Sequence, residues 1–252
     1  NAGHFSPYAV LQFNRTDILY DVPKMLFSSY GPLALKWNHL PKMIPWFLNY
    51  LKNCNKKSMF HTVKYMHQIL SLSNDAYEEI FKEINTSNLV KKKGIIYVWT
   101  SKNLKSRNLE IKIRKDLGIE QKLLTQKEIL KLEPNLNPVF DGGVIYESAM
   151  HARDPHGILK EIFKLFINKG GNFIQENITN LKQINESKTV LKSESKEYFF
   201  EKTVIASGAF SKKLTDQLGE NIPLDTERGY HVHFKKMEHL ISRPVIFLDR
   251  GF

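Results

Sequence analysis

The stretch that decides the fold is "GGVIYESAMHARDPHGILKEIFKLFINKGG", residues 142–171. It opens with a short apolar, β-branched run that is typical of a strand. A helix follows, because Asp154 can cap its first turn, Pro155 suits the first helical position, and Gly170 can end it. Between these ends, apolar residues recur at helical spacing at Ile158, Leu159, Ile162, Phe163 and Phe166. A strand followed directly by an amphipathic helix predicts an α/β fold.

The residues after this helix continue the pattern with strands. We expect them at 172–176, 178–184, 188–193, 197–207, 223–234 and 243–249. The segment 197–207 reads as one long strand or a strand pair. Its end, "TVIASGAFSKKL" at 203–214, is a buried apolar run that stops in Ser207, Gly208 and Ala209, with a helix from Ser211. Such small residues permit either a tight turn or the close approach of a flat ligand.

The first half of the chain is predicted to be more helical. Four prolines break residues 22–57 into short helices and turns, and apolar spacing favours a helix over 61–84. The pattern then predicts a strand at 94–101 and a helix over 103–117 that ends at Gly118. Thr125 and Glu128 have the spacing of a capping box at the start of another helix.

Composition sets the limits on class. The 252 residues are 42% hydrophobic, which favours a folded core, and no apolar run reaches the roughly 18 residues of a membrane span. Cys54 is the only cysteine, which excludes internal disulfides and multi-cysteine metal sites. The sequence starts without Met and ends inside an apolar run, so we expect an interior piece of a longer protein.

The net charge of +11 raises the question of an anionic partner. Because 30 of the 37 basic residues are Lys, and base readout favours Arg, we do not expect nucleic-acid binding. Residues 22–74 hold seven Lys and no acidic residue, with Trp37 and Trp46 among them. This segment suits docking on an anionic membrane surface or an acidic partner, or is a helical subdomain with a solvated lysine face.

Few residues suggest a reactive site from pattern alone. His231 and His233 share a face of a predicted strand, but no carboxylate or Cys pattern completes a metal site, so we expect none. Arg228 and Tyr230 share the other face and could bind a small carboxylate, or be a surface Arg beside a core Tyr. His4 is either a pocket residue or an ordinary loop histidine.

Six stretches in order resemble one family, the FAD-dependent amine and D-amino-acid oxidoreductases, and especially its bacterial D-amino-acid dehydrogenases. They are "NAGHFSP" (1–7), "LLTQKEILKLEPNL" (123–136), "GGVIYESAMHARDPHGILKEIF" (142–163), "GGNFIQENITNLK" (170–182), "TVIASGAFSKKL" (203–214) and "PLDTERGYHVHF" (223–234). The resemblance implies FAD as cofactor. The implied flavin-side residues are Asn1, Ala2, Gly3, Ile178, Ser207, Gly208 and Ala209, and the candidate substrate-binding residues are Arg228, Tyr230 and His4.

The resemblance also implies two domains. Residues 1–145 are expected in a substrate domain, with a flavin-side loop at 1–7 and a basic helical part at 22–84. Residues 146–212 are expected in a Rossmann-like FAD-binding domain, and residues 213–252 return to the mixed or antiparallel sheet of the substrate domain. The family's dinucleotide fingerprint and its last Gly-rich segment are not in this sequence, so we expect the fragment alone to be inactive.

The implied reaction is oxidation of a D-amino acid to a 2-oxo acid and ammonia, by hydride transfer from the C–N carbon to the flavin. Two alternatives stay open: oxidation of a secondary amine such as sarcosine or a proline derivative, and a non-catalytic basic module that docks on a membrane or partner. The expected partners are an amino-acid substrate and an electron acceptor, a quinone or another. The expected location is cytoplasmic, with peripheral contact to the inner membrane.

Overall fold

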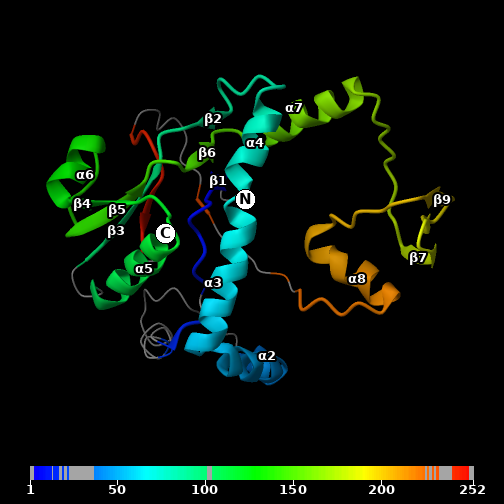
Figure 1. Ribbon diagram of the computed structural model, residues 1–252, viewed down its shortest axis with the longest axis horizontal. Coiled ribbons are helices and arrows are strands. Elements are labelled where there is room, and N and C mark those ends of the chain that lie inside the picture. Colours follow the sequence, from blue (N-terminus) through cyan, green and yellow to red (C-terminus); the bar gives the residue numbers. More distant parts are fainter. Residues whose placement is uncertain are drawn as a thin grey trace. The chain divides into compact units, whose positions relative to one another are not determined.

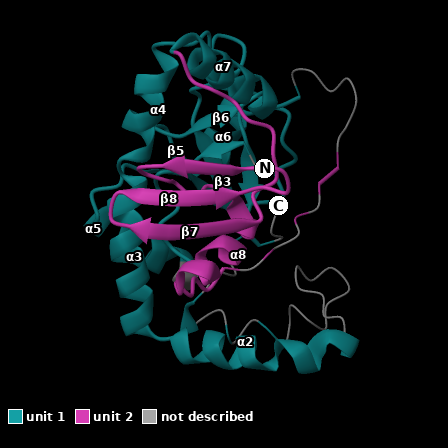
Figure 2. Ribbon diagram, turned by 90° about the vertical axis from the view of Figure 1, so that its right-hand side faces the viewer, with its two compact units in different colours: residues 1–169, 238–252 teal, residues 170–237 magenta. Residues whose placement is uncertain are grey.

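The computed structural model describes residues 3–12, 14–16, 19, 22, 37–100, 104–224, 226, 229, 231–232 and 240–249. The chain divides into two compact units (Figure 2). Unit 1 comprises residues 1–169 and 238–252, and unit 2 comprises residues 170–237. Within the described residues, no helix combines the length and apolar character that a membrane crossing requires.

The centre of unit 1 is a four-stranded mixed sheet in the order β10-β3-β5-β4 (Figure 1). Its strands are β3 (Ile95–Trp99), β4 (Lys122–Thr125), β5 (Gly142–Tyr146) and β10 (Val245–Phe247). β5 pairs antiparallel with both β3 and β4, whereas β10 runs parallel to β3. The predicted strands at 94–101, at the start of the stretch 142–171, and at 243–249 are therefore confirmed.

Glycine at position 143 is required by this pairing. A Cβ atom there would lie 2.4 Å from the carbonyl oxygen of Tyr97 on the neighbouring strand. No real side-chain carbon approaches a backbone oxygen that closely. Gly143 therefore allows β5 and β3 to pair at this register.

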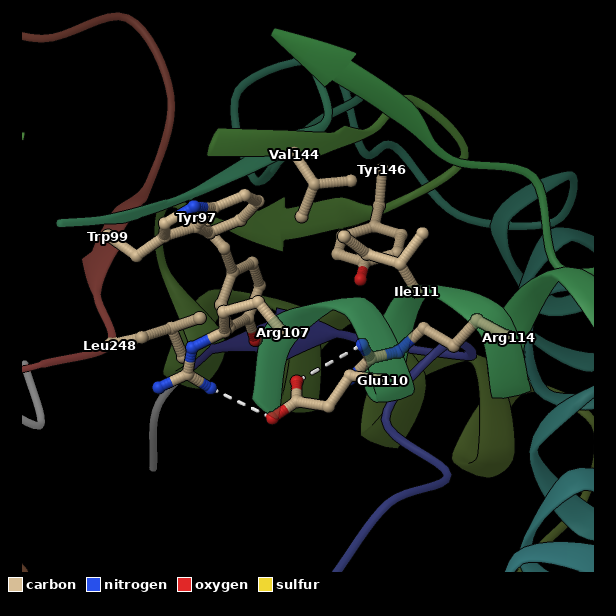
Figure 3. A pocket seen from close by; sticks show the side chains of 9 residues that line it. All are labelled: Tyr97, Trp99, Arg107, Glu110, Ile111, Arg114, Val144, Tyr146 and Leu248. Carbon is tan, nitrogen blue, oxygen red and sulfur yellow. Dashed lines mark hydrogen bonds and ion pairs between the residues drawn. The ribbon is translucent and has the colours of Figure 1, made fainter. Parts of the chain in front are cut away.

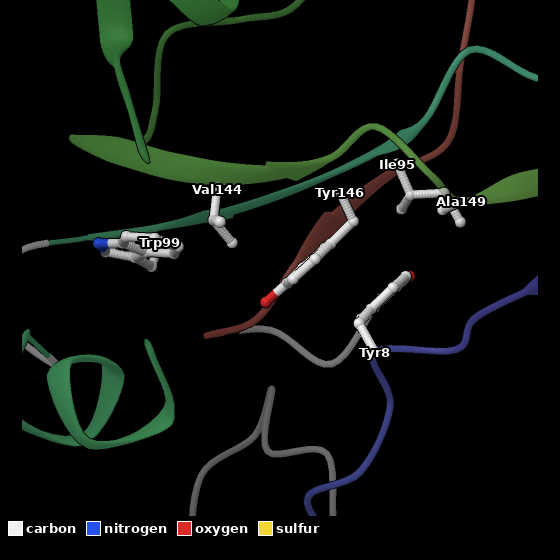
Figure 4. Close-up of a cluster of buried hydrophobic side chains, with 6 residues drawn as sticks. All are labelled: Tyr8, Ile95, Trp99, Val144, Tyr146 and Ala149. Carbon is white, nitrogen blue, oxygen red and sulfur yellow. The ribbon is translucent and has the colours of Figure 1, made fainter. Parts of the chain in front are cut away.

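Each face of this sheet is covered by a helix. One face carries a buried aromatic cluster that includes Tyr8, Trp99 and Tyr146 (Figure 4), against which Ile111 of α5 (Leu104–Asp116) packs. The other face buries Ile96 and Val98 against Ile129 of α6 (Gln126–Leu132). The alternation of side chains along β3 thus supplies both halves of the core.

The helix signals near this sheet are confirmed. Thr125 and Glu128 form the predicted capping box, in which each side chain accepts from the other's backbone amide. α5 ends before Gly118, whose φ of +72° suits glycine at a helix end. The predicted helix 103–117 agrees with α5 within one residue at each end.

A second, three-stranded sheet in unit 1 has the order β1-β6-β2. Its strands are β1 (His4–Phe5), β2 (Val90–Lys91) and β6 (Met150–Ala152), and both pairings are antiparallel. One face packs on α4 (Ser73–Phe81) and α7 (Pro155–Asn168) through a cluster of Phe81, Val90, Met150 and Ile158. α7 begins as predicted, because Asp154 accepts a hydrogen bond of 2.9 Å from the amide of Gly157.

The basic helical region differs from the prediction in two places. α2 (Leu40–Asn53) follows the turn η1 (Trp37–His39) and runs for 14 residues, although Pro45 lies inside it. Short pieces were expected there. Pro41 suits the first turn, whereas Pro45 lies inside the helix and lacks the N–H that would bond the carbonyl of Pro41, so α2 continues with one backbone hydrogen bond fewer. The predicted helix 61–84 is two helices, α3 (Lys56–Leu70) and α4, separated by a turn at Ser71 and Leu72.

Unit 2 contains the sheet β7-β8-β9 and a short helical segment. Its elements are β7 (Asn180–Asn185), β8 (Lys188–Lys192), β9 (Glu197–Phe200), η3 (Gly208–Phe210), α8 (Ser211–Thr215) and η4 (Asp216–Leu218). The predicted strands at 178–184 and 188–193 and the predicted helix from Ser211 are confirmed. The described part of the predicted strand 223–234 has no strand, and its remaining residues lie outside the described ones.

The predicted strands at 172–176 and 203–206 are wrong for this structure. Thr189 at the start of β8 pairs with Phe200, so β8 has no residues left to pair with 202–206. Val204 is consequently 88% exposed instead of buried. In the same way, the amide of Thr179 already bonds Lys192, the last residue of β8, so residues 172–176 lie beyond the ladder. A strand needs a partner for its backbone groups, and propensity does not replace one.

Candidate functional site

The most highly charged buried site in the described structure is built by α5 on the central sheet. Arg107, Glu110 and Arg114 lie at helical positions i, i+3 and i+7, so they share one face of α5. Figure 3 shows them beside the sheet residues Tyr97, Trp99, Val144 and Tyr146, with Ile111 and Leu248 completing the lining. We call this set the Arg–Glu cluster, and Arg15 also belongs to it.

Three arginines converge on one carboxylate. Glu110 receives Arg15 at 2.7 Å, Arg107 at 2.8 Å and Arg114 at 3.3 Å, and its own side chain is only 10% exposed. Burial alone would raise the pKa of Glu110, but the surrounding guanidinium groups outweigh it and hold that pKa below its ordinary value. Glu110 is therefore a fixed anion, and the cluster keeps an excess of positive charge.

A second carboxylate extends the network to the chain's last described residues. Asp249 lies 3.8 Å from Arg107 and accepts hydrogen bonds from the amide and hydroxyl of Thr100, at 2.7 and 2.8 Å. Thr100 directly follows β3, and Asp249 follows β10. The network thus links the ends of the two parallel strands to α5.

Tyrosines form the other wall of the site. The Tyr8 ring stacks on Tyr146 with centroids 3.8 Å apart, and its hydroxyl donates to that of Tyr97 at 3.3 Å. Arg114 lies over the Tyr146 ring and also donates from Nε to the carbonyl of Tyr8 at 3.2 Å. Burial raises the pKa of all three phenols, and that of Tyr146 reaches about 12. These tyrosines remain neutral and act as packing and hydrogen-bonding groups.

The space inside the Arg–Glu cluster is small. Its cavity measures about 30 Å³, which has room for a water molecule or two, whereas ligand pockets typically measure about 300 Å³ or more. The arginines lower the pKa of Glu110, which makes it a weak base, and burial raises the pKa of the tyrosines, which makes them weak acids, so the cluster offers no efficient general acid or base at neutral pH. Its chemical role is to hold Tyr8 and Arg15 against α5 and the sheet.

The structure places two of the predicted flavin-side or substrate residues in the small sheet of unit 1. Gly3 has a φ of +66°, and its carbonyl accepts the amide of Ala152 at 2.6 Å. His4 follows on β1, opposite His151. Asn1 and Ala2 lie outside the described residues.

The other predicted flavin-side residues lie in unit 2. Ile178 is half-buried just before β7, and Ser207 precedes η3, which begins at Gly208. Gly208 has a φ of +56°, and a Cβ there would meet no atom within 4 Å, as expected for a left-handed turn in open space. Ala209 is exposed in the same turn. The structure therefore groups Ser207, Gly208 and Ala209, and it groups Gly3 with His4 in the other unit.

The predicted substrate residues Arg228 and Tyr230 lie outside the described residues, as does His233. Among the described residues, no three His, Cys, Asp or Glu side chains come together as a metal site would require.

The Arg–Glu cluster is the feature that sequence reasoning missed. Its signal was present in the helix 103–117, where Arg107, Glu110 and Arg114 share a face. Arg15, which comes from far along the chain, gave no such signal.

Comparison with known sequences finds a family model that matches most of this chain. Residues 25–251 match the family model DAO, described as FAD dependent oxidoreductase. The D-amino-acid oxidase of Bradyrhizobium diazoefficiens is 29% identical over 239 residues, which cover 94% of this chain and 57% of that protein. The D-amino acid dehydrogenase of Vibrio atlanticus is 23% identical over 253 residues, which cover 99% of this chain and 57% of that protein.

Comparison with solved structures supports the fold. The L-proline dehydrogenase of P. horikoshii superposes with a TM-score of 0.56 at 14% identity, over 73% of this chain and 50% of that one. The chain thus spans slightly more than half the length of the curated relatives it matches. The expectations of a mixed α/β fold and of a flavoprotein relationship agree with these findings.

Proposed function

Because this chain belongs to the DAO family of FAD-dependent oxidoreductases, we propose that it forms part of an enzyme that oxidises the C–N bond of a small D-amino acid. The C–N bond loses two electrons and two protons to give an imino acid, which water then hydrolyses to a 2-oxo acid and ammonia. The family match over residues 25–251 carries this proposal. The names of the two sequence relatives support a D-amino acid as the substrate.

FAD is the cofactor that this proposal requires, and the described residues fit it. The backbone of Gly208 is open, because a Cβ built there meets nothing within 4 Å. Val204, just before this turn, exposes 88% of its surface, which an apolar ligand or a neighbouring strand would cover. Small side chains at Ser207, Gly208 and Ala209 allow a flat ring to approach the main chain. When bound, FAD supplies a two-electron acceptor for the hydride of the substrate.

The chain's own residues then have positioning roles. We assign Gly3, Ile178, Ser207, Gly208 and Ala209 to cofactor contacts, together with Asn1 and Ala2. Residues 146–212 serve as the FAD-binding segment, and residues 1–145 and 213–252 serve as the substrate domain. Arg228, Tyr230 and His4 are assigned to the substrate. The Arg–Glu cluster anchors the segment that follows the Gly3 loop, because Tyr8 and Arg15 are both held by it.

The test of this function is flavin reduction without oxygen. The whole flavoprotein that contains this chain is purified, and its visible spectrum is recorded before and after each member of a panel of D- and L-amino acids is added. We expect flavin absorbance, and bleaching by small D-amino acids but not by their L enantiomers. A colourless protein, or one that no amino acid bleaches, would refute the proposal.

A secondary amine is the second candidate substrate class. Proline, a secondary amine, is the substrate in the name of the structurally similar L-proline dehydrogenase of P. horikoshii, so this class is tested beside the primary amino acids. Proline and sarcosine therefore belong in the same panel. Bleaching by proline or sarcosine alone would assign the enzyme to that class.

We further propose that the protein contacts an anionic membrane through the basic helical region. α2 buries no residue completely, and its exposed apolar side chains include Ile44, Leu48 and Leu51 at helical spacing i, i+4 and i+7. Trp46 is 52% exposed and stacks on Tyr50. An exposed apolar face on a segment with seven Lys and no acid is typical of a helix that lies on a lipid surface. Such contact would bring the enzyme near a membrane-bound electron acceptor such as a quinone.

A further inference from the structure

A row of basic side chains crosses the small sheet of unit 1. His4 on β1 lies opposite His151 on β6, and Lys91 on β2 lies opposite His151 on its other side. Residues that face each other across paired strands project to the same side of the sheet. These three side chains therefore form one row across three strands, which we call the His–Lys row.

The backbone pairing brings the two imidazoles close together. The amide of Ala152 bonds the carbonyl of Gly3, which marks that pair as the hydrogen-bonded one. Pairs alternate along an antiparallel ladder, so His4 and His151 form a pair of the other kind, with Cα atoms about 4.5 Å apart. The opposite face of the sheet is apolar, because Phe5 and Met150 join the cluster under α4 and α7. The sheet thus has one core face and one basic face.

Further positive charge surrounds the row. Burial lowers the pKa of His151, and the charges of His4, Arg153, Lys91 and Lys93 lower it further. Burial also lowers the pKa of His4. Among the residues that the structure describes, none forms an ion pair with Lys91, Lys93 or Arg153. The imidazoles are neutral hydrogen-bonding groups in a positive, half-buried environment.

This environment favours a negatively charged ligand. Nδ1 of His151 is buried and has no hydrogen-bond partner among the described residues, so the row has an unused polar group. Two imidazoles could hold a divalent cation, but Lys91, Lys93 and Arg153 oppose one and attract an anion instead. A carboxylate can accept from an imidazole N–H and from Lys at the same time.

We propose that the His–Lys row is a binding site for a small carboxylate. Resting on the proposed function, this carboxylate is that of the amino-acid substrate, because Gly3, next to His4, is assigned to the flavin side. Lys91, His151 and Arg153 then join His4 as substrate-positioning residues. Fixing the carboxylate on the sheet would orient the α-carbon of the substrate.

NMR of the histidine ring signals tests this site in the 252-residue chain without flavin. Sodium acetate is added at constant ionic strength, with chloride and inorganic phosphate as separate arms, and signals are assigned with His4→Asn and His151→Asn. We expect the His4 and His151 signals to move together and to saturate with acetate. The signal of His156, which is exposed on α7, serves as the internal reference and should not move.

A matched pair of lysine variants gives the decisive comparison. Lys91→Met should weaken acetate binding roughly tenfold, with Lys91→Arg restoring it, because one charge-assisted hydrogen bond is lost. Lys92→Met should have no effect, since Lys92 is the next residue but pairs with Glu78. Equal effects of the two Met variants, no saturable shift, or tighter binding of phosphate than of acetate would overturn the proposal.

The same variants separate this inference from the proposed function. In the whole flavoprotein, Lys91→Met should raise the KM for the amino acid much more than it lowers kcat. Acetate binding without any flavin reduction would refute the function and leave the site standing. Normal flavin reduction with an unchanged KM in Lys91→Met would refute the site and leave the function standing.

Discussion

Arg15 donates a hydrogen bond of 2.7 Å to Glu110, which lies 95 positions later in the sequence, and both side chains are about nine-tenths buried. This contact ties the N-terminal segment to α5. Because Arg107 and Arg114 also bind Glu110, one carboxylate neutralises part of the charge of three arginines. The segment that follows Gly3 and His4 is therefore held by buried electrostatics as well as by the stacking of Tyr8.

Removing the shared carboxylate should destabilise unit 1 strongly. Glu110→Ala removes the carboxylate that three buried guanidinium groups share, and we expect a loss of about 3–5 kcal/mol in the free energy of unfolding. Urea unfolding followed by tryptophan fluorescence measures it. Glu79→Ala, which removes an exposed pair with Lys82, is the control and should cost no more than about 1 kcal/mol. Similar losses in the two variants would contradict a structural role for the Arg–Glu cluster.

The lowered pKa of Glu110 predicts how the stability of the fold depends on pH. The pKa of Glu110 in the folded state lies below the ordinary value of 4.5, so the folded state holds the proton less tightly than the unfolded state. The resulting stabilisation is fully present above about pH 4.5 and is lost as the pH falls through the folded-state pKa. Glu110→Gln should flatten the acid limb of a plot of unfolding free energy against pH. An unchanged acid limb would show that Glu110 is not a linked group.

Gly143 should not tolerate even a methyl group. In Gly143→Ala the new carbon would lie 2.4 Å from the carbonyl oxygen of Tyr97, so β3 and β5 must separate. We expect a loss of at least about 1–3 kcal/mol. Gly118→Ala is the matched control, because its φ of +72° imposes backbone strain while the added carbon meets no atom within 4 Å. A thermal melt that ranks Gly118→Ala as the more damaging change would contradict the predicted close approach.

Gly208 should control cofactor retention in the whole flavoprotein. If its open backbone contacts the flavin, Gly208→Leu places a side chain in cofactor volume and should abolish FAD retention. Gly219→Leu controls for backbone strain, since Gly219 is in the same unit, has a φ of +80° and also has open space around it. FAD content per chain after gel filtration is the measurement. Full retention of FAD in the Gly208 variant would show that this turn has only a conformational role.

The basic helical region should bind anionic vesicles at low salt and release them at high salt. Each Lys near such a surface contributes about 1 kcal/mol, and salt screens this term. Changing Lys52, Lys56 and Lys57 to Glu should therefore abolish sedimentation with the vesicles without changing flavin reduction. Changing Lys188, Lys192 and Lys196 of unit 2 to Glu gives a control of equal charge change. Equal pelleting of both triple variants would show that the helical lysines are only a solvated face and do not bind the membrane.

Short-range sequence patterns predicted the helices whose ends carry capping residues. Asp154 caps α7, Thr125 and Glu128 cap α6, and Gly118 follows α5, because capping depends only on residues three or four positions apart. The β-branched run at 95–99 likewise gave β3. The ordered set of six stretches also gave the family, since the order and spacing of motifs are properties of the sequence itself.

Tertiary structure decided what depends on partners. Residues 203–206 have the composition of a buried strand, yet β8 ends before it could pair with them, so Val204 is exposed. No sequence pattern around Arg15 predicts that it is buried, but the fold buries it against Glu110. The His–Lys row exists only because the registers of β1, β6 and β2 align His4, His151 and Lys91. Caps follow from neighbours along the chain, whereas strand pairing and buried charge pairs require residues that only folding brings together.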